Sequence, residues 1–388
     1  MLSTLAIGNY RSLLQLVIPL GRLNVITGAN ASGKSNLYRA LRLLAETARG
    51  GVVQALAHEG GLSSTLWAGP ESLSPSMRKG SVPVQGGARK NPIRLNLGFA
   101  REDFGYAISL GLPTPSSSAF SRDPEIKRES IWAGPFYRLA SALVDRQGSV
   151  IRIRSGQTWE TITGNATKFE SMFSQIADPA RTPEVYQMRE MIRAWRFYDH
   201  FRTDHDAPAR LPQLGTLTPV LHHDGHDLGS ALQTIREIGD GRALDEAISD
   251  AFPGSALSIG SQDDGRLFVQ FHQDGLLRPL HATELSDGTL RYLLWVAAML
   301  TPRPPSLMVL NEPETSLHPD LLPALARLIT RASETAQIWV VSHSTRLIGA
   351  LNQSPECHSI ELEKEHGETR VAGQGLLDQP QWHWPDKG

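Results

Sequence analysis

The sequence is poor in cysteine and in long apolar segments. Cys357 is the only cysteine among 388 residues, so an internal disulfide is excluded and a reducing, cytoplasmic location is expected. The longest apolar stretches, around residues 13–20 and 293–300, are shorter than the roughly 20 residues that a membrane-spanning helix needs. No Lys or Arg precedes the first apolar residues, which is atypical of a secretory signal. We therefore expect no membrane partner.

Neither sign of charge is in excess, and no sustained heptad pattern is present. The formal net charge of −2 gives no global attraction to nucleic acid, so a DNA contact would require a local basic patch. The missing heptads exclude a long coiled-coil arm. A hydrophobic content of 40% nevertheless suits a folded chain with a large core.

Hydrophobic periodicity predicts an α/β protein. Residues 23–27 form an apolar run that ends in a glycine-rich turn, and apolar residues then recur at helical spacing over residues 37–44. Two further apolar runs, 307–310 and 338–341, alternate with helical patterns. This alternation is typical of a parallel sheet covered by helices.

The middle of the chain differs from its ends. Residues 93–100, 106–112 and 149–162 are expected to be strands of an antiparallel sheet. From residue 168 to about 248 the pattern becomes helical, with one apolar stripe behind the possible N-cap Asp227. We therefore expect a discontinuous main domain over residues 1–165 and 255–388, with residues 166–254 as an inserted helical lobe.

One motif points directly to nucleotide binding. Gly28-Ala-Asn-Ala-Ser-Gly-Lys-Ser35 fits the P-loop pattern and lies between a predicted strand and a predicted helix. The loop N–H groups and the helix N-terminus form an anion cradle, Lys34 reaches the β- and γ-phosphates, and the Ser35 hydroxyl ligates Mg²⁺. The expected nucleotide-binding residues here are Gly28, Asn30, Ala31, Ser32, Gly33, Lys34, Ser35 and Asn36.

Four fragments in the second half indicate which P-loop protein this is. They are the loop Leu285-Ser-Asp-Gly-Thr289, the strand end Asn311-Glu312-Pro313, the segment Glu314-Thr-Ser-Leu-His-Pro319 and the strand end Val341-Ser-His-Ser344. In this order they resemble the signature loop, the Walker B strand, the D-loop and the switch histidine of ABC-type ATPases of the RecF, SMC and OLD-like group. The resemblance covers roughly residues 1–60 and 280–350.

The resemblance implies a fold, a chemistry and an assembly. The fold would be an ABC-type ATPase head with a mixed sheet core, an antiparallel β subdomain and the helical lobe. ATP and Mg²⁺ would be bound, with Lys34, Glu312 and His343 as catalytic residues. Ser286 and Gly288 would contact the nucleotide across a homodimer interface. Ile7-Gly-Asn-Tyr-Arg-Ser12 resembles the start of RecF and SMC heads, where the basic residue lies near the phosphates, so Arg11 is expected to contact ATP.

Two residues depart from the family pattern. Asn311 replaces the Walker B aspartate, so a neutral carbonyl oxygen stands where the family has a carboxylate that helps to hold the metal. Because Glu312 is retained, we still expect Mg²⁺-dependent ATP hydrolysis, at a reduced rate. Asp287 and Thr289 also make the signature differ from the usual Leu-Ser-Gly-Gly form.

Other polar clusters carry weaker expectations. The histidines and aspartates of residues 200–227 suggest a metal site, but turn chemistry and an N-cap at Asp227 explain them without one. The segment 78–94 contains five basic residues and no acid, which makes it the best candidate for contact with a phosphate backbone. Arg189, Arg193 and Arg196 lie at helical spacing among aromatic residues that more often belong to a core.

Two functions remain open. The first is a dimeric ATPase clamp that acts on DNA in repair, genome maintenance or antiviral defence. The second is a slow nucleotide-gated switch that controls a protein effector without binding DNA, and Asn311 favours it. Ser286 follows Lys34 by 252 positions, a separation that argues against a transporter subunit, and the 45 residues after His343 are too few for the nuclease domain of OLD-type relatives.

Overall fold

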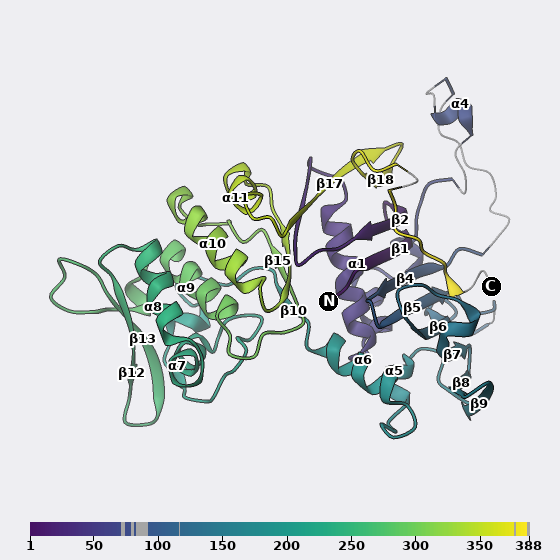
Figure 1. Cartoon of the computed structure of the whole chain (residues 1–388), viewed down its shortest axis with the longest axis horizontal. Helices are drawn as coiled ribbons and strands as arrows, with labels where there is room; N and C mark the ends of the chain where they lie inside the picture. Colours follow the sequence, from purple (N-terminus) through teal and green to yellow (C-terminus); the bar gives the residue numbers. More distant parts are fainter. Residues whose placement is uncertain (71–73, 79–80, 83–91, 116, 376–377, 386–388) are drawn as a thin grey trace. The chain divides into compact units, whose positions relative to one another are not determined.

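A computed structural model describes residues 1–388 apart from 71–73, 79–80, 83–91, 116, 376–377 and 386–388 (Figure 1). The described chain divides into two compact units. Unit 1 comprises residues 1–20, 28–194 and 360–388, and unit 2 comprises residues 21–27 and 195–359. Each unit is therefore assembled from segments that lie far apart in the sequence.

Unit 1 is built on an eight-stranded antiparallel sheet with the strand order β2-β1-β4-β5-β6-β7-β8-β9. Apolar residues face one another across β1 and β4: Leu5 lies opposite Phe99 and Ile7 opposite Leu97, and all four side chains are buried. The strands are β1 (Thr4–Tyr10), β2 (Leu13–Pro19), β4 (Leu95–Ala100), β5 (Phe104–Gly111), β6 (Glu125–Ala133), β7 (Ala142–Gln147), β8 (Val150–Ser155) and β9 (Thr158–Thr163).

The helix that follows the P-loop packs on this sheet. Helix α1 (Lys34–Thr47) contacts β1 and β4 and buries Leu37, Leu41 and Leu44 at the spacing of one helical face. The remaining elements of unit 1 are α2 (Val52–His58), α3 (Leu62–Thr65), α4 (Pro75–Arg78), η1 (Leu139–Ser141), α5 (Met172–Gln175), α6 (Pro183–Arg193) and the antiparallel hairpin of β17 (Cys357–Glu365, which begins in unit 2) with β18 (Glu368–Val371).

Unit 2 contains four parallel strands in the order β10 (Arg196–Tyr198), β15 (Leu307–Asn311), β16 (Gln337–Val341) and β3 (Leu23–Gly28). The first four residues of β15 and all five of β16 are buried. Such continuous apolar runs are typical of parallel strands that are covered on both faces. The last residue of β3, Gly28, opens the second segment of unit 1.

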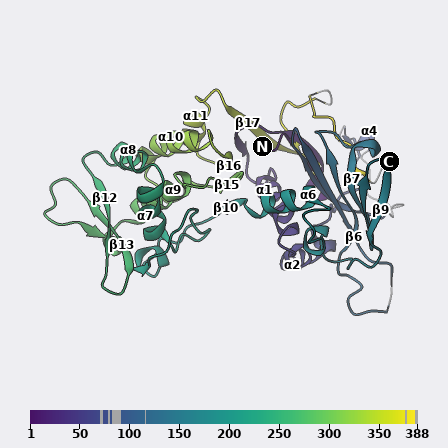
Figure 2. The same cartoon turned by 60° about the horizontal axis from the view of Figure 1, so that its bottom comes forward.

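Helix α9 (Asp287–Met299) is central to unit 2, since every residue from Leu290 to Met299 is buried. The other helices are α7 (Leu228–Ile238), α8 (Gly241–Ala251), α10 (Leu322–Ala332) and α11 (Thr345–Leu351), with short 3-10 turns η2 (Pro208–Arg210), η3 (Ala282–Glu284) and η4 (Pro319–Leu321). Unit 2 also contains a small antiparallel sheet (Figure 2). It consists of β11 (Gln213–Leu214), β12 (Ala256–Ser261), β13 (Arg266–His272) and β14 (Leu280–His281).

Several elements differ from the sequence-based expectation. The stretch 149–162 is a hairpin of two strands, β8 and β9, and not one strand. The segment 168–248 is not wholly helical, because it contains the short strands β10 and β11. The expected lobe 166–254 is divided, with α5 and α6 in unit 1 and α7 and α8 in unit 2.

Asp227 stands at the N-cap position of α7, but its carboxylate does not cap that helix. Its Oδ1 instead accepts the backbone N–H of His222 at 3.1 Å. The carboxylate is therefore committed to the preceding turn.

Among the described helices, none combines the length and the apolar character that a membrane crossing requires.

Candidate nucleotide-binding site

The P-loop has the backbone that an anion cradle requires. Gly28 and Gly33 have φ values of 137° and 113°, in the left-handed region that favours glycine. A Cβ on Gly28 would lie 2.2 Å from the backbone oxygen of Leu362, and one on Gly33 would lie 2.1 Å from Oγ1 of Thr369. Both glycines are therefore needed for conformation and for close packing. Gly33 is also the N-cap of α1, so the loop leads directly into a helix N-terminus.

The Lys34 side chain lies against this loop. Its Nζ donates to the backbone oxygens of Gly28 at 2.6 Å and Ala29 at 2.8 Å, and the residue is 5% exposed. The Lys34 ammonium is thus held beside the P-loop, which is the phosphate-binding loop of proteins with this motif. Ser35 is exposed in the first turn of α1.

A directed chain of hydrogen bonds supports the loop from behind. Asn36 Nδ2 donates to Ser12 Oγ at 2.8 Å, Ser12 and Thr369 hydroxyls lie 2.7 Å apart, and Thr369 Oγ1 donates to the backbone oxygen of Ser32 at 2.7 Å. Because each hydroxyl has one hydrogen, Ser12 must donate to Thr369. Thr369 is fully buried. Its role was not predicted, because it is 337 positions from Ser32 and belongs to no motif.

Arg11 has a partner that the sequence did not suggest. Its Nη2 lies 2.8 Å from Oε2 of Glu59, which also accepts from the Tyr10 hydroxyl at 2.5 Å. Burial favours the neutral guanidine, but the hydrogen bonds to Glu59 and Tyr10 outweigh burial and raise the pKa of Arg11. The ion pair holds the cation in the turn next to Ser12. Contact between Arg11 and ATP stays a prediction.

In unit 2, two of the three expected catalytic residues, Glu312 and His343, meet at the carboxyl ends of the parallel strands. Asn311 ends β15 in register with Val341 of β16. Glu312 follows with φ of 50°, a conformation that non-glycine residues rarely adopt, and its N–H donates to the Val341 oxygen at 2.8 Å. Its Oε1 lies 3.5 Å from Nε2 of His343. The two side chains are 49% and 40% exposed, so both are accessible to a ligand.

Glu314 connects the two strand ends. Its Oε1 accepts from Ser342 Oγ at 2.7 Å, from His343 N at 2.8 Å and from Ser344 N at 3.1 Å. Three donors on one carboxylate oxygen fix the backbone that carries the switch histidine. The sequence placed Glu314 in the D-loop region but gave it no role.

The signature loop, residues 285–289, is also fixed by its neighbours. Ser286 is exposed and caps α9, its Oγ accepting the Thr289 N–H at 3.1 Å. Asp287 Oδ1 accepts from Nη2 of Arg210 at 2.7 Å. Nη1 of the nearly buried Arg210 donates to the backbone oxygens of Ala282 and Leu285, each at 2.7 Å. The unusual Asp287 is thus the partner of a cation that holds the loop.

Helix α9 is tied to the segment after Glu312. Arg291, 4% exposed, donates to the Thr315 oxygen at 2.9 Å and to the Phe201 oxygen at 2.8 Å. Nε1 of Trp295 donates to the Pro313 oxygen at 3.0 Å. The signature helix and the D-loop region are therefore parts of one hydrogen-bonded arrangement.

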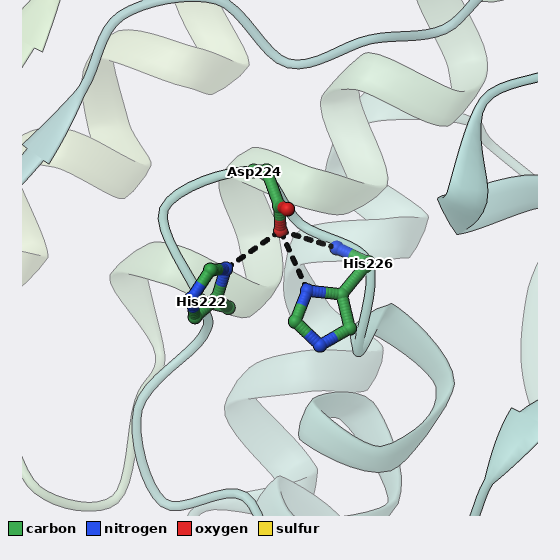
Figure 3. Close-up of side chains that lie close together, drawn as sticks. All are labelled: His222, Asp224 and His226. Atoms are coloured by element: carbon green, nitrogen blue, oxygen red, sulfur yellow. Dashed lines mark hydrogen bonds and ion pairs between the residues drawn. The ribbon is translucent and has the colours of Figure 1, made fainter.

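Three members of the histidine and aspartate cluster converge (Figure 3). Nδ1 of His222 and Nδ1 of His226 each lie 2.7 Å from Oδ1 of Asp224, which also accepts the His226 N–H at 3.1 Å. Burial raises the pKa of Asp224, but the hydrogen bonds from His226 and His222 outweigh burial and lower it.

The ligand atoms of this cluster lie within 4.8 Å of one another, so the set could hold a metal ion. Two ligands of one tetrahedral zinc lie about 3.3 Å apart, farther than the 2.7 Å between each histidine nitrogen and the carboxylate. Hydrogen bonds of the turn account for the arrangement, and we assign it to turn structure.

The predicted site residues are divided between the two units. Unit 1 contains Arg11, Ser12, Asn36 and the P-loop, whereas unit 2 contains Ser286, Gly288, Asn311, Glu312 and His343 with their supporting arginines. The chain connects the two sets directly, since β3 pairs with β16 as far as Ile26 opposite Val341 and the P-loop begins two residues later.

One family model matches most of the sequence. The family model described as "AAA domain, putative AbiEii toxin, Type IV TA system" matches residues 23–349, which is more than half of the chain. No curated protein matches the sequence.

Among solved structures, a crystal structure of an Smc head bound to the C-terminal winged-helix domain of ScpA is similar at 14% identity and a TM-score of 0.51, covering 97% of this chain and 98% of that one. An Smc head with an extended coiled coil, bound to the C-terminal domain of ScpA from Pyrococcus furiosus, has 13% identity, 97% and 96% coverage and a TM-score of 0.48. The SMC head domain from Thermotoga maritima has 14% identity, 97% and 99% coverage and a TM-score of 0.44.

The predicted family and fold class are therefore confirmed: the chain belongs to the AAA_21 family of AbiEii-like AAA ATPases and has the fold of an SMC-head-like P-loop ATPase.

Proposed function

We propose that this chain binds ATP with Mg²⁺, hydrolyses it slowly and acts on DNA as an ATP-bridged homodimer. The observation that carries the ATPase step is the Glu312–His343 pair at the carboxyl ends of the parallel strands, 3.5 Å apart. The family supports hydrolysis. Lys34 beside the P-loop oxygens supports phosphate binding.

Glu312 is the proposed general base. Water attacks the γ-phosphorus as the bond to the β,γ-bridging oxygen breaks, ADP leaves, and the water proton passes to the Glu312 carboxylate. His343 stabilises the transferring phosphoryl group, in a position set by Glu314. Lys34 offsets the negative charge that develops on the leaving oxygens.

The residues present fit a bound Mg²⁺. The exposed Ser35 hydroxyl and the Asn311 side-chain oxygen are the hard oxygen donors that this ion prefers. Bound Mg²⁺ would supply charge neutralisation on the phosphates. The missing carboxylate at Asn311 is the reason for the proposed slow rate.

The proposed dimer rests on the signature loop. Ser286 is exposed and Gly288 is half-buried, and the N-terminus of α9 is a favourable place for a phosphate from a second copy. The likeness to an Smc head supports only the fold of such a head.

Action on DNA rests on the basic segment 78–94. Lys79, Arg89 and Lys90 lie outside the described residues, whereas the Arg94 backbone oxygen accepts from Asn9 Nδ2 at 2.9 Å. Double-stranded DNA should stimulate ATP turnover more strongly at low salt than at high salt, because phosphate contacts release counterions. Arg89→Glu with Lys90→Glu should remove that stimulation and leave ATP affinity unchanged.

The second candidate is a nucleotide-gated switch for a protein effector, and Asn311 is the feature that favours it. ATP turnover that ignores DNA at both salt concentrations, together with unchanged turnover in the charge-reversed variant, would select the switch. A wild-type chain that does not bind ATP at all would remove both candidates.

A further inference from the structure

The strand next to β15 is followed directly by an aspartate, Asp199. Strand β10 runs parallel to β15 with Phe197 opposite Val309 and Tyr198 opposite Leu310. Asp199 is the next residue on one strand, and Asn311 is the next residue on the other. Neighbouring strands lie about 4.8 Å apart, so the backbones of Asp199 and Asn311 are adjacent at the carboxyl ends of the sheet.

The two segments stay together beyond the strands. Arg291 joins them, because it donates to the backbone oxygens of both Phe201 and Thr315. Trp295 also contacts both segments. Its ring centroid lies 4.8 Å from that of Phe201, and its Nε1 donates to the Pro313 oxygen. Helix α9 therefore holds the segment that follows Asp199 and the segment that follows Asn311.

We propose that the Asp199 carboxylate replaces the carboxylate that Asn311 lacks and helps to hold the Mg²⁺ of the bound nucleotide. This inference rests on the proposed function and deepens it. Mg²⁺ keeps several of its waters in protein sites, and a carboxylate one strand away can accept hydrogen bonds from such waters. The charge is thus retained at this end of the sheet but is carried by the neighbouring strand.

Three other acids of unit 2 already have a structural role or a proposed catalytic role. Oε1 of Glu314 already accepts three hydrogen bonds. Asp287 is paired with Arg210, and Glu312 lies beside His343 as the proposed base. Asp199 is partly buried, and it is the acid that the register places next to Asn311. Its neighbour His200 has its Nε2 3.5 Å from Arg291 Nη2.

The test measures Mg²⁺ dependence of ATP binding and not turnover. Affinity for ATP is determined by calorimetry in excess Mg²⁺ and in EDTA for the wild-type chain and for Asp199→Asn. We expect equal affinities in EDTA and a loss of roughly tenfold or more in the Mg²⁺-dependent gain, as for the loss of a charged hydrogen-bonding partner. Mn²⁺ in place of Mg²⁺ provides a second readout, since its electron paramagnetic resonance signal reports binding to the protein–ATP complex.

A charge relocation separates a role in metal binding from a structural role. The double variant Asp199→Asn with Asn311→Asp should recover the Mg²⁺-dependent gain, because it returns one carboxylate to the site. If the single variant does not fold, the double variant decides alone: a folded double variant with wild-type Mg²⁺ dependence supports the proposal, and one without it overturns the proposal.

The matched control is Asp206→Asn, which removes the same charge from the same segment at a side chain that is 87% exposed. It should leave both affinities unchanged. Wild-type ATP binding that is enhanced by Mg²⁺, together with an undiminished gain in Asp199→Asn, would overturn the inference and leave the proposed function intact. Absence of ATP binding by the wild-type chain would instead reject the proposed function.

Discussion

Oε1 of Glu312 lies 3.5 Å from Nε2 of His343, and the backbones that carry them are joined by the carboxylate of Glu314. A base and a phosphate-contacting group are therefore set at a fixed separation by a third residue.

Glu312→Gln should keep ATP bound, slow hydrolysis by roughly 10²- to 10⁴-fold and accumulate an ATP-dependent dimer. The amide keeps the shape of the carboxylate but cannot accept the water proton. Turnover assays and size-exclusion chromatography with light scattering, run with ATP and Mg²⁺, measure both effects. Glu334→Gln, at an exposed position of the same unit, is the control.

The dimer prediction has its own test within that background. Adding Ser286→Arg should place a bulky side chain at the exposed cap of α9 and return the protein to monomers that still bind ATP. A Glu312→Gln protein that stays monomeric while saturated with ATP would count against the ATP-bridged assembly.

Lys34→Ala should abolish ATP binding, because it removes the cation held beside the oxygens of Gly28 and Ala29. Calorimetric titration with ATP and Mg²⁺ measures the loss. Lys364→Ala changes an exposed lysine of the same unit and should bind ATP as the wild type does. Retained affinity in the Lys34 variant would refute the P-loop assignment.

Glu314→Ala should slow ATP hydrolysis by roughly tenfold or more while ATP affinity stays within a few-fold of wild type. The variant leaves the N–H groups of His343 and Ser344 without their acceptor, at a cost of about 1–3 kcal/mol in the free energy of unfolding. Steady-state kinetics and urea unfolding are the measurements. Glu334→Ala serves as the comparison, and equal turnover in the two variants would show that His343 needs no such support.

Arg210→Ala should lower the free energy of unfolding by about 2–4 kcal/mol, because several backbone oxygens and Asp287 lose one shared donor. Asp287→Asn keeps an acceptor at the same place and should cost less. Urea denaturation of both, alongside Arg202→Ala at an exposed ion pair, checks the order. Equal losses at Arg202 and Arg210 would mean that Arg210 is not the residue that holds the signature loop.

Thr369→Val removes the hydroxyl that donates to the Ser32 oxygen and accepts from Ser12. We expect ATP affinity to fall several-fold and the free energy of unfolding to fall by about 1–3 kcal/mol, since buried polar partners lose their match. Thr158→Val, at an exposed strand position, should change neither. Unaltered ATP affinity in Thr369→Val would show that this chain of hydrogen bonds is not needed for nucleotide binding.

The motifs could be located from the sequence because each is local. The run 23–27 and the glycine turn predicted β3 and the P-loop, and the helical spacing over residues 37–44 predicted α1. Periodicity within one segment decides such elements. Family and fold class followed from the order of the motifs.

The supports could not be located in the same way, because they are contacts between distant segments. Thr369 and Ser32, or Arg210 and Leu285, have no local pattern that joins them. Strand β10 has three residues, too few for period-two alternation to distinguish it from the helical pattern around it. Asp199, which follows this strand, was consequently not singled out from the sequence.

The hydrogen bond from Thr369 also determines what a C-terminal truncation of this chain would lose. A chain that stopped after α11, at Leu351, would retain the P-loop, the signature loop, Glu312 and His343, and would still score as a complete ATPase by its motifs. It would lack the hydroxyl that meets the Ser32 oxygen and the Leu362 backbone against which Gly28 packs. Such a truncated chain would therefore contain every ATPase motif and still bind nucleotide poorly, because the C-terminal hairpin packs against the P-loop and supports it.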